Sequence, residues 1–182
     1  MKAVVDVDDL IEEQQIQDLL MPLRFAVPAL RVTAYAVPNR LGPVDGLKKR
    51  YPWITFGIHG FEHTFAECRA WTSDLTEALI GASLEMGYDR VFKAPNWILD
   101  SEVEEALAKL RVTLHHHEDY KPSAAKLYVY PMGKPSNVKS VHTHLIKNPA
   151  TDHISEHPGF TPDALGKFRE FLLPMDVALQ LC

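Results

Sequence analysis

Short apolar runs alternate with amphipathic stretches along most of the chain. Seven of these runs are rich in β-branched and aromatic residues and predict strands, at Lys2–Leu10, Arg31–Val37, Trp53–Ile58, Arg90–Pro95, Arg111–His117, Lys126–Pro131 and Val138–Ile146. Several are apolar at nearly every position, which is typical of strands that are buried on both faces of a parallel sheet.

The segments between these runs carry helix signals. A helix is predicted after Thr72-Ser73 and up to Gly87, a glycine placed as C′. Ser101 and Glu104 form a capping box ahead of apolar residues with helical spacing. Thr161-Pro162 is expected to open a final helix, and weaker signals predict helices at residues 10–20 and 41–50. This alternation predicts an α/β fold with right-handed crossovers, and because no linker interrupts it, we expect one domain over residues 1–182.

Composition and charge exclude several classes of protein. The chain has 182 residues, 46% of them hydrophobic and 24% charged, which are ordinary values for one globular domain. The net charge of −5 and the lack of a basic cluster argue against a nucleic-acid partner. No apolar stretch approaches the roughly 20 residues of a membrane span, so we expect no membrane partner. The N-terminal apolar run is too short for a signal peptide, and Cys68 and Cys182 form no CxxC pair, so we expect a cytoplasmic protein.

Ionisable side chains gather where the predicted strands end, at Asp8, Asp9, His59, Lys93, His115, His116, His117, His142 and His144. In a parallel sheet the carboxyl ends of the strands share one edge, and sites form there. The pattern therefore predicts one polar site at this edge.

His59 and His63 are the first candidates for metal binding. If the chain turns into a helix after Ile58, positions i and i+4 lie on one face and can share an ion. Neutral imidazole nitrogens are good zinc ligands, and a carboxylate is a natural third ligand that leaves a position open for water. The alternative is a pair of ordinary surface or core histidines.

Asp8 and Asp9 end the first strand, where buried carboxylates are costly unless they are used or solvated. One of them could bind a metal while the other acts as a general base. Alternatively, Asp9 is the N-cap of the following helix. His142 and His144 lie two apart in a strand and so face the same side, either as proton donors at the site or as solvated residues of an edge strand.

The order of these motifs resembles that of the polysaccharide deacetylase family, carbohydrate esterases with a NodB-homology domain. The similar motifs are "DVDDL", "HGFEH", "FKAPNW" and "VHTH", and they extend over roughly residues 2–146. The resemblance implies an α/β fold in the form of a distorted, incomplete (β/α) barrel of about seven mostly parallel strands. It also implies a metal-dependent hydrolase that removes an acyl group from an N-acetylated sugar or a related amide, with a carbohydrate or other small molecule as its substrate.

The resemblance also implies residue roles. Asp9, His59 and His63 would hold one divalent metal ion, with zinc preferred and other transition metals as alternatives. Asp8 would be the catalytic base, and the general acid would be His144 or His142, with His144 favoured. The substrate groove would be lined by Lys93, Pro95, Asn96 and Trp97.

The chain departs from the family pattern at several positions. Leu10 stands where the family has Gly, and Lys93 replaces an Arg, which removes a bidentate donor. The Asp-containing motif of the family has only Asp119 as a candidate.

Two other functions are compatible with the sequence. "VVDVDDL" also resembles the first strand of haloacid-dehalogenase-like phosphatases, which would place Asp6 and Asp8 on a magnesium site. The barrel could also have lost its activity and serve as a binding protein.

Overall fold

The computed structural model describes residues 4–26, 28, 30–115, 126–128 and 140–144. Its strands are β1 (Val4–Leu10), β2 (Val32–Ala36), β3 (Ile54–Ile58), β4 (Val91–Phe92), β5 (Thr113–Leu114), β6 (Lys126–Tyr128) and β7 (Ser140–His144). They form one sheet in the order β5-β4-β3-β2-β1-β7-β6, and every recorded pairing is parallel. The seven predicted strands are therefore confirmed. Because the order is linear, with β5 and β6 at its two ends, the described sheet does not close, in agreement with the predicted incomplete barrel.

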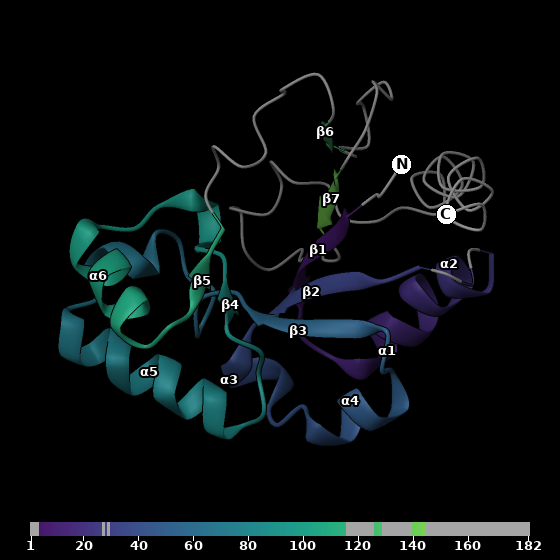
Figure 1. Ribbon diagram of the computed structural model, residues 1–182, viewed down its shortest axis with the longest axis horizontal. Helices are drawn as coiled ribbons and strands as arrows, with labels where there is room; N and C mark the ends of the chain where they lie inside the picture. Colours follow the sequence, from purple (N-terminus) through teal and green to yellow (C-terminus); the bar gives the residue numbers. More distant parts are fainter. Residues whose placement is uncertain (1–3, 27, 29, 116–125, 129–139, 145–182) are drawn as a thin grey trace.

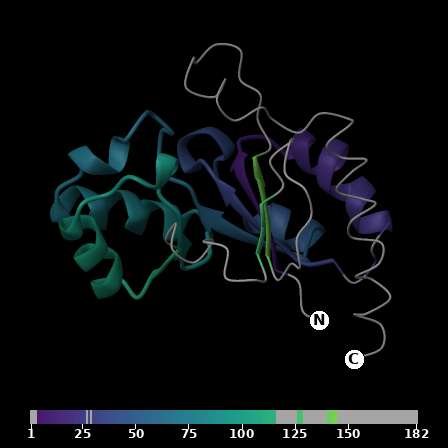
Figure 2. The same ribbon diagram turned by 90° about the horizontal axis from the view of Figure 1, so that it is seen from above.

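Helices follow most of the strands, as the sequence predicts for an α/β fold. They are α1 (Glu13–Gln15), the π-helical η1 (Ile16–Leu20), α2 (Met21–Ala26), α3 (Pro38–Leu41), α4 (Asp45–Arg50), the 3₁₀-helix η2 (Glu67–Ala70), α5 (Ser73–Glu85), the 3₁₀-helix η3 (Pro95–Trp97) and α6 (Ser101–Lys109). Figure 1 shows α5 and α6 together at the β4–β5 end of the sheet, and both views place α1 and α2 on the opposite side of the molecule (Figures 1 and 2).

The helix boundaries confirm some predicted caps and correct others. Thr72 is the N-cap of α5, where its hydroxyl accepts a hydrogen bond from the Leu75 amide, and Gly87 follows α5 with a φ of 91°. The predicted capping box at Ser101 is wrong, because Asp100 is the N-cap of α6 and Ser101 is already helical. The helix predicted from Thr161 lies outside the described residues.

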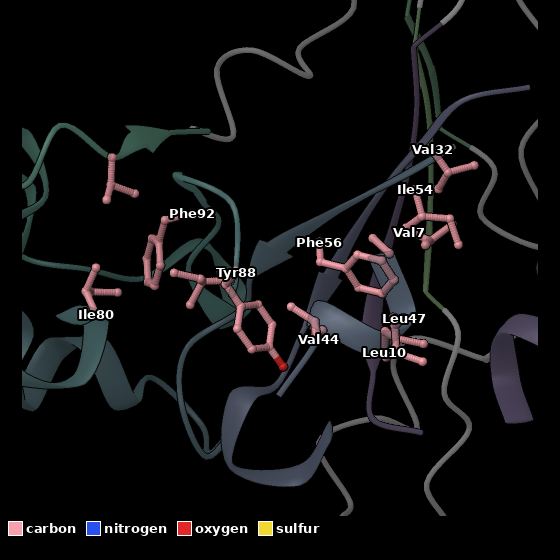
Figure 3. Close-up of a cluster of buried hydrophobic side chains, with 14 of the residues drawn as sticks. Val7, Leu10, Val32, Val44, Leu47, Ile54, Phe56, Ile80, Tyr88 and Phe92 are labelled. Atoms are coloured by element: carbon pink, nitrogen blue, oxygen red, sulfur yellow. The ribbon is translucent and has the colours of Figure 1, made fainter. Parts of the chain in front are cut away.

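The hydrophobic core runs along the sheet from β1 to β4. Figure 3 shows side chains of the first three strands packed beside those of the α4 region, with side chains of α5 and β4 at the other end; labelled there are Val7, Leu10, Val32, Val44, Leu47, Ile54, Phe56, Ile80, Tyr88 and Phe92. All of these are buried. A core of this kind fixes the strands rigidly, and so it fixes the edge at which they end. In the part of the chain that the structure describes, no helix has the length and apolar character to cross a membrane.

Candidate active site

The carboxyl edge of the sheet carries the predicted polar groups, because main-chain hydrogen bonds continue past the strand ends. The His59 amide donates to the Ala36 carbonyl at 2.8 Å, and the Lys93 amide donates to the Ile58 carbonyl at 3.0 Å. The neighbouring strands thereby hold the first residue after β3 and the first residue after β4 in fixed places beside each other.

A bulge in β1 brings Asp8 and Asp9 to the same place. Val7 pairs with Ala34 but Leu10 pairs with Ala36, so three steps along β1 match two along β2. In a regular strand, consecutive side chains point to opposite faces. Here Asp9 has a φ of 65°, and both carboxylates approach Nε2 of His59, with Asp8 Oδ2 at 3.9 Å and Asp9 Oδ1 at 3.4 Å. Such left-handed backbone at a non-glycine residue costs free energy and tends to occur at functional sites.

A loop, rather than the predicted helix, brings His63 beside His59. The described chain after Ile58 is not helical until η2, and His63 itself has a φ of 61°. The prediction of proximity is nevertheless confirmed, because the two imidazole centroids lie 5.0 Å apart. His59 and His63 are therefore close together, as predicted, but the loop and not a helix brings them together.

Asp9, His59 and His63 form a group with the geometry of a metal site. One donor atom from each residue lies within 4.8 Å of the other two. The alternative of Asp9 as a helix N-cap is wrong, because Glu12 occupies that position in α1. Nδ1 of His59 makes a 2.8 Å hydrogen bond with the Lys93 carbonyl. Since a carbonyl can only accept, Nδ1 carries the proton and Nε2 presents its lone pair to the group, which is the usual arrangement of a metal-binding histidine.

The distances and charges of this group suit a small divalent cation. Ligand atoms at 2.0–2.1 Å from a tetrahedral ion lie about 3.4 Å apart, and His59 Nε2 and Asp9 Oδ1 are separated by 3.4 Å. The 2.7 Å contact between His63 Nε2 and the same oxygen is an ion-pair contact that an ion would replace. Among the described residues, the buried charged side chains are Asp8, Asp9, Glu67 and Lys93. With three negative groups and one positive group, their ionised forms carry a net charge of −2, which a divalent cation would balance.

His63 shows the competition between a proton and a cation at this site. Burial lowers the pKa of His63, but the hydrogen bond to Asp9 and the negative charges of Asp9, Asp8 and Glu67 outweigh burial and raise the pKa above its ordinary value. The same negative surroundings that hold a proton on His63 would also attract a metal ion.

Lys93 is buried next to the carboxylate of Asp8 and does not reach the surface. Its side chain is fully buried, and its Nζ donates to Asp8 Oδ1 at 2.7 Å. The ammonium also lies 4.1 Å from the ring centroid of Tyr35 and 5.2 Å from that of Trp97. Both rings stabilise the cation, and the hydroxyl of Tyr35 is itself hydrogen bonded to Nδ1 of His115.

The structure describes the side chains of only some of the other predicted site residues. Pro95 is buried, whereas Asn96 and Trp97 are half-buried and have left-handed backbones in η3, which follows β4. For the two late histidines only the backbone is described: β7 pairs His144 with Asp8 and His142 with Asp6. His116, His117 and Asp119 lie outside the described residues.

Two features of the site were missed by the sequence analysis. Glu67 accepts three backbone hydrogen bonds from the His59–His63 loop, and Tyr35 joins Lys93 to His115. The position of Tyr35 near the end of a predicted strand could have indicated it. Glu67 has no such signal, because it follows an irregular loop.

Comparison with known proteins gives agreement at the level of the fold. No family model and no curated protein matches the chain. A family 4 carbohydrate esterase from Streptomyces lividans, solved in complex with acetate, is 13% identical with a TM-score of 0.63, and the match covers 96% of this chain and 89% of that one. The peptidoglycan deacetylase PdaC from Bacillus subtilis is 10% identical with a TM-score of 0.57, and the match covers 96% and 84%.

A third similar structure is described as a pseudoenzyme. It is a family 4 carbohydrate esterase pseudoenzyme from Bacillus anthracis, 11% identical with a TM-score of 0.53, and the match covers 93% of this chain and 61% of that one. Identities of this size establish architecture and leave activity to be argued from the site. The chain has the fold of the family 4 carbohydrate esterases and resembles these polysaccharide deacetylases over most of its length.

Proposed function

We propose that the protein is a metal-dependent hydrolase that removes an acyl group, acetyl first of all, from an N-acetylated sugar or a related amide. The observation that carries the proposal is the pair of carboxylates at the β1 bulge, because Asp8 and Asp9 both approach Nε2 of His59 at the carboxyl edge of the sheet. A metal ligand and a general base placed side by side are what hydrolysis of an unactivated amide needs.

Asp9, His59 and His63 would hold the ion, with zinc preferred because two imidazoles and one carboxylate suit it. Bound there, a divalent ion supplies Lewis acidity, which polarises the carbonyl of the substrate and lowers the pKa of a water molecule. These three residues leave further coordination positions for water and substrate. Other transition metals that accept nitrogen and oxygen ligands remain alternatives.

Asp8 is the proposed general base. Lys93 holds Oδ1 of Asp8, whereas Oδ2 lies on the side of His59, where it can take the proton of the attacking water. We assign Lys93 the task of orienting this carboxylate, because its ammonium is buried against it. Pro95, Asn96 and Trp97 keep their proposed place along the substrate groove.

The leaving amine needs a proton, and His144 or His142 would provide it. The backbone register sets His144 opposite Asp8 across the β1–β7 pair, and His142 lies two residues earlier opposite Asp6. This register supports the preference for His144, because it lies nearer than His142 to the carboxyl edge of the sheet.

The phosphatase alternative would use Asp6 and Asp8 with magnesium. The metal-capable group that the described residues form contains Asp9 and two histidines, a donor set that suits a transition metal better than magnesium. The second alternative, an inactive binding protein, is a real one for this architecture, because one similar structure is a pseudoenzyme.

The decisive experiment combines metal content with hydrolysis. We expect the purified protein, loaded with zinc or cobalt, to bind one ion per chain and to release acetate from at least one member of a panel of N-acetylated sugars and oligosaccharides. The variant His59→Ala/His63→Ala should lose stoichiometric metal and reduce hydrolysis at least 100-fold, because only Asp9 would be left.

Glu62→Gln is the matched control, because Glu62 lies between the two histidines but its exposed carboxylate pairs with the Asn39 amide at 2.8 Å. It should keep both metal and activity. Full metal content in the double variant would overturn the metal site. Bound metal without hydrolysis of any substrate would favour the binding protein, and hydrolysis of phosphate esters with magnesium would favour the phosphatase.

A further inference from the structure

The loop that carries His63 is shaped by one buried carboxylate. Glu67 is the first residue of η2 and only 8% exposed. Its Oε1 accepts hydrogen bonds from the amides of Phe61 and His63, each at 3.0 Å, and its Oε2 accepts one from the amide of Glu62 at 3.1 Å. Three consecutive amides of a non-helical loop are therefore satisfied by a single side chain.

Gly60 makes room for that carboxylate. A Cβ atom at residue 60 would lie 1.7 Å from Oε1 of Glu67 and 2.7 Å from Cγ of Pro95, so any side chain there would displace Glu67. Gly60 also has a φ of +65°, which turns the chain immediately after His59. The sequence Gly60-Phe61-Glu62-His63 is thus folded around the Glu67 carboxylate.

We infer that Glu67 is a positioning residue of the metal site: its carboxylate sets the conformation of the His59–His63 loop and thereby holds His63 against Asp9. The inference rests on the metal site of the proposed function, to which it adds a residue that does not contact the ion. His63 has a left-handed backbone that a free loop would rarely keep. Its amide is tied to Glu67, and its Nε2 lies 2.7 Å from Asp9 Oδ1.

The negative charge of the Glu67 carboxylate, as well as its shape, helps to hold the loop and to favour a cation at the site. An amide at this position would offer one acceptor oxygen and would turn an N–H₂ group toward one of the three backbone donors. Hydrogen bonds to a carboxylate are also roughly twice as strong as those to a neutral group. A buried negative charge under the loop that carries His63 also favours a cation at the site. Removal of groups that orient metal ligands typically weakens metal binding about 10–100-fold.

The first test compares Glu67→Gln with Glu62→Gln in the full chain. Titration with Co²⁺, followed by its visible absorption and by competition with a chelator, gives the dissociation constant without any use of activity. We expect Glu67→Gln to weaken Co²⁺ binding 10–100-fold and to alter the absorption bands, because His63 is no longer held in place. Glu62→Gln should match the parent protein. Thermal unfolding in a chelator checks that the metal-free variants are folded.

A second pair of variants distinguishes the effect of displacing Glu67 from the effect of backbone strain at a glycine of positive φ. Gly60→Ala and Gly42→Ala both introduce a Cβ at positive φ, +65° and +73°, but nothing lies within 4 Å of a Cβ at Gly42. We expect both to lose some stability and only Gly60→Ala to lose cobalt affinity.

Two results would overturn the inference. One is a cobalt dissociation constant for Glu67→Gln within twofold of that of Glu62→Gln. The other needs no variant: the amides of Phe61, Glu62 and His63 exchanging in the metal-free parent as fast as in an unstructured peptide. A parent protein that binds no ion would overturn this inference and the proposed metal site together. A parent that binds cobalt but hydrolyses nothing would overturn only the proposed activity, and the comparison of Glu67→Gln with Glu62→Gln would still decide the role of Glu67.

Discussion

At the scale of single residues, Asp8 and Asp9 are chemically distinct although they are neighbours in sequence. Asp9 contacts the two histidines, whereas Asp8 is paired with a fully buried ammonium. The Lys93 ammonium lies near two aromatic rings and pairs with the Asp8 carboxylate. Removing one charge of such a buried pair strongly destabilises the fold, because the other charge stays buried without its partner.

Replacement of Lys93 by Met should therefore be strongly destabilising. We expect Lys93→Met to lower the free energy of unfolding by roughly 3–5 kcal/mol, because the carboxylate of Asp8 stays buried after its ammonium is gone. Urea unfolding of the metal-free protein measures this value. Adding Asp8→Asn should recover part of the loss, since the second change removes the stranded charge.

Lys48→Met is the control, because Lys48 pairs with Asp89 at the same 2.7 Å but both side chains are about one third exposed. A pair of that kind contributes about 0–1 kcal/mol. A loss for Lys93→Met no larger than that for Lys48→Met would show that the buried pair adds nothing to stability.

The sequence was sufficient to bring Asp9 and His59 to one edge, because their strand-end positions follow from the apolar runs, and the family resemblance grouped His63 with them. It was not sufficient for the local backbone. The bulge at Asp8–Asp9 and the left-handed residues Gly60 and His63 have no periodic signal, so Glu67, whose role depends on them, could not be predicted.

At the scale of elements, several described strands place polar side chains at one edge, as β1 does with Asp8 and Asp9 and the residue after β3 does with His59. The short strands β4 and β5 were predictable because the apolar runs of the sequence extend beyond them, and amides past their ends still bond to the neighbouring strand, as His115 does to the Phe92 carbonyl at 2.9 Å. The predicted 10–20 helix begins at Glu13 and continues beyond residue 20, because α1, the π-helical η1 and α2 follow one another without a break to Ala26.

The helix α5 offers a test of how much a single cap contributes to stability. Thr72→Ala removes the acceptor for the Leu75 amide, a hydrogen bond of 3.3 Å, and should lower the free energy of unfolding by about 1 kcal/mol. Ser73→Ala is the matched control, because Ser73 already lies inside the helix and its change should be nearly neutral. Equal losses in urea unfolding for the two variants would mean that Thr72 does not act as the cap.

At the scale of the whole molecule, the site joins strands that are distant in the sequence. Asp9 comes from β1 and His59 from the end of β3, with β2 between them, and the hydrophobic core holds all three strands (Figures 1 and 3). An ion bound by Asp9, His59 and His63 would bind the folded chain and not the unfolded one, and so it should stabilise the whole fold.

This linkage should depend on pH in a definite direction. The pKa of His63 is raised in the fold. Without metal, the resulting stabilisation is complete below the unfolded value of about 6.5 and is lost as the pH rises through the folded pKa. The ion needs the neutral imidazole, so protons compete with it at low pH. We expect the rise in Tm caused by excess zinc to be smaller at pH 6 than at pH 8, by scanning calorimetry. Subtracting the same series for His63→Ala removes the contribution of the other histidines, and a zinc effect that is larger at pH 6 than at pH 8 after this subtraction would exclude His63 as a ligand.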